Sequence, residues 1–234
     1  MINKIVGTVE EAVAGVPDGA TVMISGFGGA GQPAELIDAL IDQGAKDLTI
    51  VNNNAGNGEV GLAALLKARR VRKIICSFPR QVDSHVFDSL YRAGQLELEL
   101  VPQGNLAERI RAAGAGIGAF FTPTGYATQL AEGKETRIIN GRGYVLEYPI
   151  FADFALVKAD RGDRWGNLVY RKTARNFGPI MASAAKCTVV QVRETVELGA
   201  LDPEAVVTPG IFVKRVVKVA APLPSRSTSE SKAA

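Results

Sequence analysis

Short apolar runs alternate with amphipathic segments throughout the first half of the chain. The runs that predict strands lie at residues 21–24, 48–51, 71–76 and 96–101. The segments that predict helices lie at residues 33–41, 61–67, 82–92 and 106–113. In the first of these helices Leu36, Ile37, Leu40 and Ile41 recur at helical spacing. This alternation predicts an α/β fold, with an open, mostly parallel sheet and helices on both of its faces.

The pattern changes after about residue 115. Four short β-prone segments follow, and we expect them to form hairpins or additions to the sheet; they lie at residues 137–139, 144–146, 154–157 and 167–170. One more helix is predicted over 177–185 and one more strand over 188–192. We expect a single domain over residues 1–219. Residues 220–234 are small and polar, which predicts a disordered tail.

Charge and composition argue against several classes of protein. The net charge of the chain is +3, and its basic residues are scattered along the sequence. Aromatic residues make up only 6% of the chain, so a nucleic-acid-binding surface is not expected. Cys76 and Cys187 lie in apolar, strand-like runs, which favours buried thiols over a metal site or a disulfide. We find no signal peptide and no apolar run long enough to span a bilayer, so a cytoplasmic location is expected.

A glycine-rich loop connects the first strand to the helix that starts near Pro33. Glycines allow a tight turn and a close approach to a ligand, and the free N–H groups of the helix start favour anions. Gly26, Gly28 and Gly31 have the spacing of a dinucleotide-binding loop. A nicotinamide site also needs an acidic residue after the second strand, but that strand runs into residues 52–54, which are all asparagine. A nicotinamide-dependent oxidoreductase is therefore a distant alternative, and a tight turn without a ligand is another.

The loop and its surroundings resemble the first signature sequence of the family I coenzyme A (CoA) transferases. Within that family the chain is similar to the A (alpha) subunit. The match comprises Asp18, Gly19, Val22, Met23, Ile24, Gly26, Phe27, Gly31 and Pro33, while Ser25 stands where the family has the first glycine of a pair. Further matching segments follow in the family's order, at residues 51–56, 76–80, 101–109, 121–126, 162–167 and 175–180. The resemblance extends to about residue 219.

The resemblance implies an activity and a mechanism. Within the family the pattern is most similar to members that move CoA from succinyl-CoA to 3-oxoadipate in the β-ketoadipate pathway of aromatic catabolism. Acetoacetate is the alternative acceptor. A CoA thioester is then a substrate, and no permanently bound cofactor or metal is expected. A non-catalytic CoA-binding or regulatory module is the competing interpretation.

The resemblance also implies a partner chain. The family's nucleophilic glutamate lies in a Ser-Glu-Asn-Gly segment, which this chain lacks. A B subunit should therefore supply that carboxylate, in a heterotetramer of two A and two B chains. Glu59 is the only glutamate in a glycine-rich context near the predicted strand ends, and we expect it to be a surface or helix-start residue and not the nucleophile. His85 is expected to be a helix residue and not a catalytic base.

The predicted site residues follow the carboxyl ends of the strands, where open α/β sheets bind their ligands. Gln103 matches the family's amide donor to the oxyanion. Asn53 and Asn54 could orient a substrate carboxylate or could bond their own backbone in a turn. Arg80 is a candidate for the cation that binds the far carboxylate of a dicarboxylic acid. The residues assigned to CoA binding are those of the glycine loop: Ser25, Gly26, Phe27, Gly28, Gly29, Ala30 and Gly31.

Overall fold

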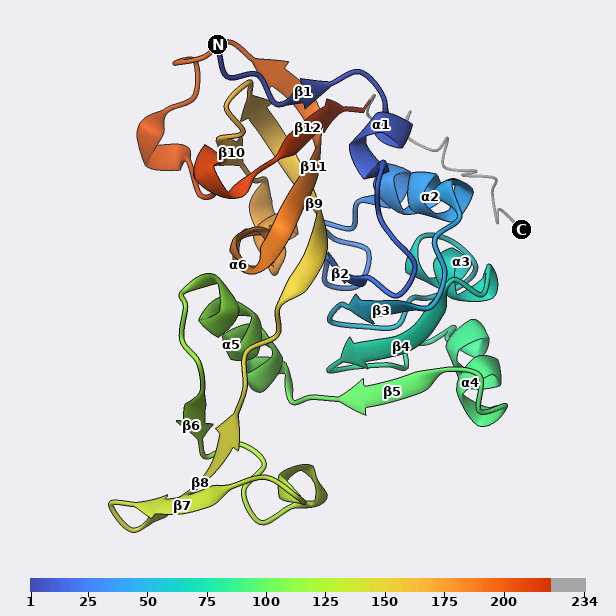
Figure 1. The fold of residues 1–234 in the computed structure, drawn as a ribbon, viewed down its shortest axis with the longest axis vertical. Helices are drawn as coiled ribbons and strands as arrows, with labels where there is room; N and C mark the ends of the chain where they lie inside the picture. Colours follow the sequence, from blue (N-terminus) through green and yellow to red (C-terminus); the bar gives the residue numbers. More distant parts are fainter. Residues whose placement is uncertain (220–234) are drawn as a thin grey trace, which may run out of the picture.

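A computed structural model describes residues 1–219, which contain a nine-stranded sheet and a smaller three-stranded sheet (Figure 1). The large sheet has the order β1-β12-β11-β9-β2-β3-β4-β5, and β10 pairs with β9. All of its neighbouring strands are parallel except β10. Its strands are β1 (Ile5–Val6), β2 (Thr21–Ile24), β3 (Leu48–Val51), β4 (Val71–Cys76), β5 (Glu97–Leu100), β9 (Ala152–Asp163), β10 (Leu168–Val169), β11 (Ala185–Val196) and β12 (Arg215–Lys218).

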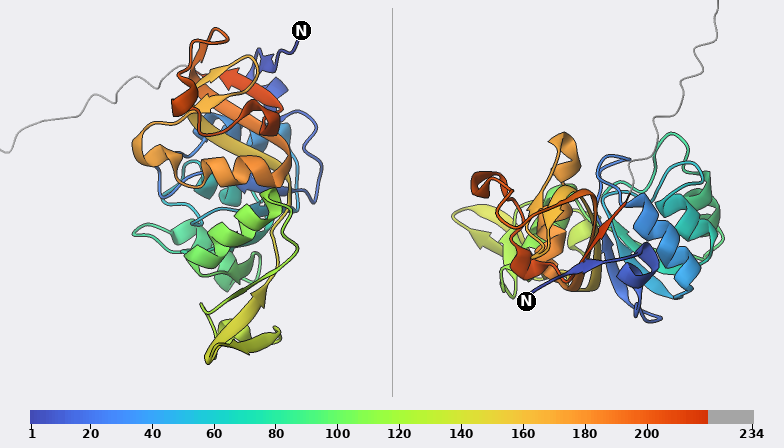
Figure 2. Two further views of the ribbon diagram at one scale, coloured as in Figure 1. Left: turned by 90° about the vertical axis from the view of Figure 1, so that its left-hand side faces the viewer. Right: turned by 90° about the horizontal axis from the view of Figure 1, so that it is seen from above.

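Helices cover both faces of the large sheet, as the right-hand view of Figure 2 shows. One face packs against α1 (Val9–Val13), α2 (Ala34–Gln43), α3 (Leu62–Lys67) and α4 (His85–Arg92). The other face packs against α5 (Gln103–Gly114) and α6 (Gly178–Ala184). Successive strand residues enter opposite cores, so that Ile74 joins the first and Ile75 the second. This burial on both faces explains why the strand sequences are continuously apolar.

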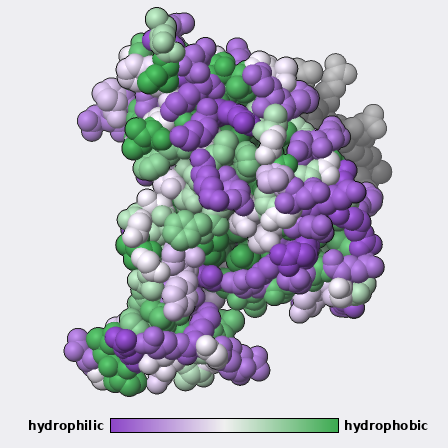
Figure 3. Space-filling view, in the orientation of Figure 1, coloured by the Kyte–Doolittle hydropathy of each residue, from purple (hydrophilic) through white to green (hydrophobic). Residues whose placement is uncertain are grey.

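The smaller sheet forms an arm that projects from the body of the molecule (Figure 1). Its strands are β6 (Phe120–Thr122), β8 (Arg142–Glu147) and β7 (Thr136–Ile139), in that order and antiparallel. Glu147 is 4% exposed and joins the arm to the body, because it accepts hydrogen bonds from Lys134 at 2.8 Å and from Asn105 of α5 at 3.4 Å. Ile138 and Ile139 are exposed, and Figure 3 shows apolar colour at the far end of the arm.

Four short 3-10 helices complete the described chain: η1 (Gln129–Ala131), η2 (Lys172–Arg175), η3 (Pro203–Ala205) and η4 (Gly210–Phe212). Within residues 1–219 no helix combines the length and the apolar character needed to cross a membrane. In the same residues no three His, Cys, Asp or Glu side chains converge as metal ligands would. Both cysteines are free; Cys76 is buried, which raises the pKa of its thiol to about 12, whereas Cys187 is only half-buried.

The α/β fold with a mostly parallel sheet agrees with the prediction, with differences at particular elements. β9 is a twelve-residue strand between β2 and β11, at the centre of the sheet, and is longer than the expected segment 154–157. α4 begins three residues later than expected because the hydroxyl of Ser84 accepts the N–H of Gln81 and residues 81–84 form a loop. α5 begins at Gln103, three residues before the expected start. The tail expected over 220–234 lies outside the described residues.

Candidate functional site

The loops that follow β2, β3, β4 and β5 meet at one edge of the sheet, because the carboxyl ends of parallel strands point the same way. They line an open cleft of about 940 Å³. Its lining residues are Phe27, Gly28, Asn53, Ser77, Phe78, Arg80, Gln81, Val82 and Gln103. The structure therefore brings together five of the predicted site residues, which come from four separate segments of the chain.

Asn53 connects three of these segments. Its side chain is 2% exposed, and its Oδ1 accepts hydrogen bonds from Gln103 Nε2 at 2.8 Å and from Ser77 Oγ at 2.7 Å. Its backbone carbonyl accepts the N–H groups of Ser77 and Phe78 at 3.2 and 3.0 Å. The loop after β3 is thereby fastened to the loop after β4 and to the first turn of α5.

The two neighbouring asparagines shape the same turn. Asn52 is fully buried and its Nδ2 donates to the carbonyl of Ile24 at 2.6 Å, which ties β3 to the end of β2. Asn54 is 1% exposed, and its Oδ1 accepts the N–H of Gly56 at 2.9 Å. Its Nδ2 has no hydrogen-bond partner within residues 1–219. Asn54 therefore makes the local turn contact that was one of its two expected roles, and it does not line the cleft.

Gln103 is the first residue of α5, directly after Pro102. The first N–H groups of a helix have no partner within the helix, and together they give its N-terminus a partial positive charge. An amide nitrogen carries two hydrogens. One hydrogen of Gln103 Nε2 is directed at Asn53, which leaves the second for a ligand in the cleft. The arrangement presents a fixed neutral donor beside a helix start, as the stabilisation of an oxyanion requires.

The glycine loop is closed on itself and on the body of the protein. Phe27 and Ala30 exchange backbone hydrogen bonds of 3.0 and 3.1 Å. Ser25 is fully buried, and its hydroxyl donates to the carbonyl of Gly31 at 2.8 Å and accepts the N–H of Lys158 at 3.1 Å. Gly31 has φ +77°, and a Cβ there would lie 2.6 Å from the carbonyl oxygen of Ala174. The serine that replaces the family's glycine thus holds the base of the loop, below its surface.

The loop residues assigned to CoA binding face different directions. Phe27 and Gly28 line the cleft, and Ala30 lines a second cavity. Ser25, Gly26, Gly29 and Gly31 do not line the cleft; Ser25, Gly26 and Gly31 are buried, whereas Gly29 is exposed.

Arg80 is the only charged residue that lines the cleft in the described part of the chain. Its Nε donates to Asp88 Oδ1 at 2.5 Å, and the side chain is 54% exposed. Phe78 and Val82 beside it are exposed apolar residues. Neither of them was predicted from the sequence, and nor was Ser77. Asn53 and Gln103 were predicted because they follow strands closely. The same criterion, applied to β4, would also have identified Ser77 and Phe78.

No carboxylate, cysteine or histidine lines the cleft in residues 1–219. Glu59 lies elsewhere, where it pairs with Lys67 at 2.9 Å and lies 3.6 Å from His85. The hydrogen bond from Lys67 lowers the pKa of Glu59, so that this residue is an ionised surface group. His85 is the first residue of α4, as expected of a helix residue. The cleft offers hydrogen-bond donors, one cation and apolar surface, but no nucleophilic carboxylate.

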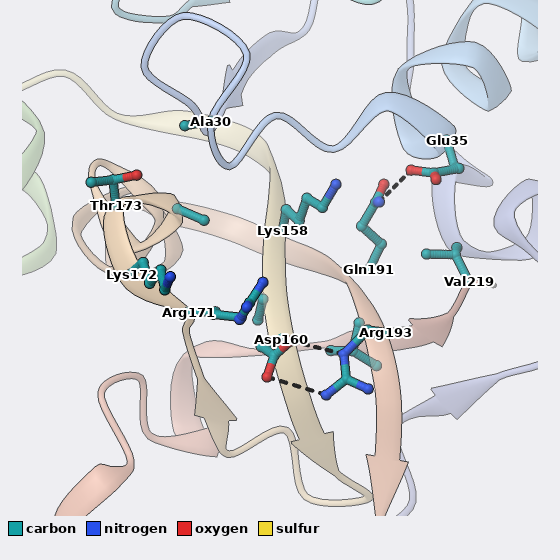
Figure 4. Close-up of a pocket in the computed structure, with 13 residues that line it drawn as sticks. Ala30, Glu35, Lys158, Asp160, Arg171, Lys172, Thr173, Gln191, Arg193 and Val219 are labelled. Atoms are coloured by element: carbon teal, nitrogen blue, oxygen red, sulfur yellow. Dashed lines mark hydrogen bonds and ion pairs between the residues drawn. The ribbon is translucent and has the colours of Figure 1, made fainter. Parts of the chain in front are cut away.

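The second cavity, of about 370 Å³, lies between the start of α2, β9, β11 and η2 (Figure 4). Ala30 is the only predicted site residue that lines it. Arg193 pairs there with Asp160 at 3.0 Å, and the side-chain amide of Gln191 donates to Glu35. Lys158 and Arg171 also line this cavity, and they form no ion pair within residues 1–219.

Comparisons with known proteins point to one family. The model of the family described as "Coenzyme A transferase" matches residues 6–219. The chain is 70% identical over 219 residues to the A chain of the 3-oxoadipate CoA-transferase of Pseudomonas putida, covering 94% of this chain and 95% of that relative. It is 49% identical over 216 residues to the A chain of a probable succinyl-CoA:3-ketoacid coenzyme A transferase of Bacillus subtilis. That match covers 92% of this chain and 90% of that relative.

A solved structure shares the fold. The acyl-CoA transferase of E. coli O157:H7, determined as a thioester complex with CoA, matches with a TM-score of 0.81 at 22% identity. The match covers 93% of this chain and 50% of that protein. The similarity establishes a common architecture of sheet and helices.

Proposed function

Because this chain belongs to the coenzyme A transferase family, we propose that it is the A (alpha) chain of an enzyme that moves CoA from succinyl-CoA to 3-oxoadipate. The observation that carries the proposal is the amide of Gln103, held by Asn53 in a cleft at the carboxyl ends of the strands. The relative from Pseudomonas putida, which is matched over nearly its whole length, supports the choice of substrates. CoA thioesters are bound as substrates, and the β-ketoadipate pathway in the cytoplasm is the proposed setting.

The chemistry is covalent catalysis in two symmetrical halves. A carboxylate of the enzyme attacks the thioester carbonyl of succinyl-CoA, the C–S bond breaks, and a mixed anhydride and a CoA thiolate result. The thiolate then attacks the enzyme's acyl carbon, which releases succinate and leaves an enzyme thioester. The carboxylate of 3-oxoadipate attacks this thioester and the steps run in reverse. Each attack creates a tetrahedral oxyanion, and the free N–H of Gln103 stabilises it by ~3 kcal/mol.

In the proposed enzyme the attacking carboxylate belongs to a partner chain. The lining of the cleft supports this division, since it contains no Asp or Glu in residues 1–219. Ser77 is a poor substitute as nucleophile, because its hydroxyl donates to Asn53 and no base contacts it within the described chain. The relative from Pseudomonas putida is the A subunit of its enzyme, which also supports the presence of a second, B-type chain here. Two copies of each chain form the proposed assembly.

Arg80 and its apolar neighbours support a dicarboxylic acceptor. A 3-oxoadipate molecule reacts through one carboxylate and carries a second at its far end. The terminal N–H groups of Arg80 can donate two hydrogen bonds to that second carboxylate, while Phe78 and Val82 contact the carbon chain. Acetoacetate is the second candidate acceptor, favoured by the similarity to the Bacillus subtilis relative.

The other two interpretations have less support. A nicotinamide site lacks its acidic residue, and Asn52 and Asn54 are engaged with the backbone at the position where that residue would stand. A non-catalytic CoA-binding module would not need the amide of Gln103 to be held in one orientation.

The experiment compares this chain alone, the partner alone and the two together, each with succinyl-CoA and either 3-oxoadipate or acetoacetate. The proposal predicts activity only in the mixture, with a higher kcat/KM for 3-oxoadipate. Activity of this chain alone would contradict the division of labour. A higher kcat/KM for acetoacetate than for 3-oxoadipate would make acetoacetate the acceptor, and the enzyme would still be a CoA-transferase.

A further inference from the structure

Ser77 has no role in the chemistry described above, although its hydroxyl lies within hydrogen-bond distance of two oxygens of Asn53. Ser77 Oγ is 2.7 Å from Asn53 Oδ1 and 3.2 Å from the Asn53 backbone carbonyl. The hydroxyl has a single proton to donate. Which oxygen receives that proton decides how the asparagine side chain is oriented.

The backbone carbonyl of Asn53 already accepts two N–H groups, those of Ser77 and Phe78. A carbonyl oxygen has two lone pairs, so both are occupied. The proton of Ser77 is therefore left for Oδ1, which is also the nearer oxygen. This bond keeps Oδ1 of Asn53 facing Ser77 and keeps Nδ2 turned away.

The orientation of Asn53 in turn fixes that of Gln103. Because Oδ1 can only accept, Gln103 must present its Nε2 to it, and the 2.8 Å bond between them has this form. If the amide of Asn53 were reversed, Nδ2 would face Gln103 and would draw the carbonyl oxygen of Gln103 toward it. The hydrogen of Nε2 that is now aimed at the cleft would then be displaced.

We propose that Ser77 is a positioning residue: acting through Asn53, it holds the Gln103 amide in the one orientation that aims an N–H at the reacting oxygen. The inference rests on the proposed function, in which Gln103 stabilises the oxyanion. It predicts that Ser77 matters for kcat and not for substrate binding, although the residue lines the cleft.

The test uses the assembled enzyme and the variants Ser77→Ala, Ser77→Thr, Gln103→Ala and the double variant Ser77→Ala/Gln103→Ala. Loss of one neutral hydrogen bond corresponds to a kcat lowered roughly fivefold to tenfold in Ser77→Ala, with KM within about twofold of wild type. Ser77→Thr keeps the hydroxyl and should keep kcat within about twofold. The double variant should be no slower than Gln103→Ala, because Ser77 acts only through Gln103.

Three results would overturn the inference. Unchanged kcat in Ser77→Ala would remove the role altogether. An equal fold-loss from Ser77→Ala in the wild-type and Gln103→Ala backgrounds would show that Ser77 acts independently of Gln103. A raised KM at constant kcat would make Ser77 a substrate-binding group.

A control separates a positioning role from general damage. Ser89→Ala removes a hydroxyl that bonds the carbonyl of Val86 on α4, outside the cleft, and should leave kcat unchanged. Should Ser77→Ala fail to assemble, Ser77→Cys decides the question, because it keeps the size of the side chain but is only a weak donor: a lowered kcat at unchanged KM supports the inference, and an unchanged kcat contradicts it. Absence of transferase activity in the wild-type assembly would instead refute the proposed function.

Discussion

The amide nitrogen of Gln103 donates a 2.8 Å hydrogen bond to Oδ1 of Asn53, which lies fifty residues earlier in the chain. The two residues follow different strands, β5 and β3, with β4 between them in the sheet. The parallel order of these strands brings their carboxyl ends to one edge, and with them the two amides. The site is therefore a product of the strand order.

Replacing Gln103 removes the proposed donor to the oxyanion. Gln103→Ala in the assembled enzyme is predicted to lower kcat by about 100- to 1,000-fold, with a small change in KM, because the contact forms fully only in the transition state. Gln103→Glu should be at least as slow, since its negative charge repels the oxyanion. Steady-state kinetics provide the measurement. Gln95→Ala is the matched control, as that exposed glutamine bonds Arg69 away from the cleft; a loss of less than tenfold for Gln103→Ala would contradict the role.

Arg80 should determine the choice of acceptor. Arg80→Gln is predicted to lower kcat/KM for 3-oxoadipate by roughly 10- to 100-fold, because a hydrogen-bonded charge on the far carboxylate is lost. The kcat/KM for acetoacetate, which has no second carboxylate, should change little. Arg72→Gln is the control, since Arg72 pairs with Glu97 at 2.9 Å on the surface. Equal losses for both acceptors would show that Arg80 does not recognise the second carboxylate.

Gly31 should be intolerant of a side chain. Its φ of +77° is strained for other residues, and an added Cβ would lie 2.6 Å from the carbonyl oxygen of Ala174. Gly31→Ala is predicted to destabilise the protein by about 1–3 kcal/mol, which lowers Tm by about 3–10 °C at fixed protein concentration. In Gly29→Ala the Cβ meets nothing within 4 Å, so a change of about 1 °C is expected. Similar Tm values for the two variants would refute this account of the loop.

His85 should make stability depend on pH. The hydrogen bond to Asp83 at 2.8 Å, and in addition Glu59, raise the pKa of His85 in the folded protein. A folded pKa above the unfolded value of about 6.5 means that the stabilisation is complete below that pH and is lost as the pH rises through the folded pKa. The Tm difference between wild type and His85→Gln should therefore be larger at pH 5.5 than at pH 8.5. A difference that grows with pH would contradict the prediction, and Asp83→Asn should reduce the pH dependence.

The sequence alone predicted the parts of this fold that depend on local pattern. β3 and β4 lie at the predicted residues because their apolar runs are buried on both faces. The central place of β9 was not predictable in this way, since Asp153, Lys158 and Asp160 interrupt its apolar pattern. The start of α5 at Gln103 was missed because the Gln-Gly-Asn sequence carries no helical periodicity of its own.

The sequence predicted several residues of the candidate site, but it did not predict the hydrogen bonds that connect them. The position of Gln103 and Asn53 after strands indicated a shared crevice, and the structure places both there. Ser77 could not be recognised as their partner from sequence, because its role depends on the contact between the loops after β3 and β4. The burial of Ser25 beneath the glycine loop likewise follows from the approach of β9, which the sequence does not reveal.

In the proposed enzyme this chain stabilises the oxyanion while another chain carries the nucleophile. Intact-mass measurement of both chains distinguishes this division of roles from one in which this chain is itself the nucleophile, after the assembled enzyme is mixed with succinyl-CoA in the absence of an acceptor. The partner chain is expected to gain the mass of CoA less one water, as a glutamyl thioester, while this chain keeps its own mass. A CoA adduct on this chain would refute the assignment.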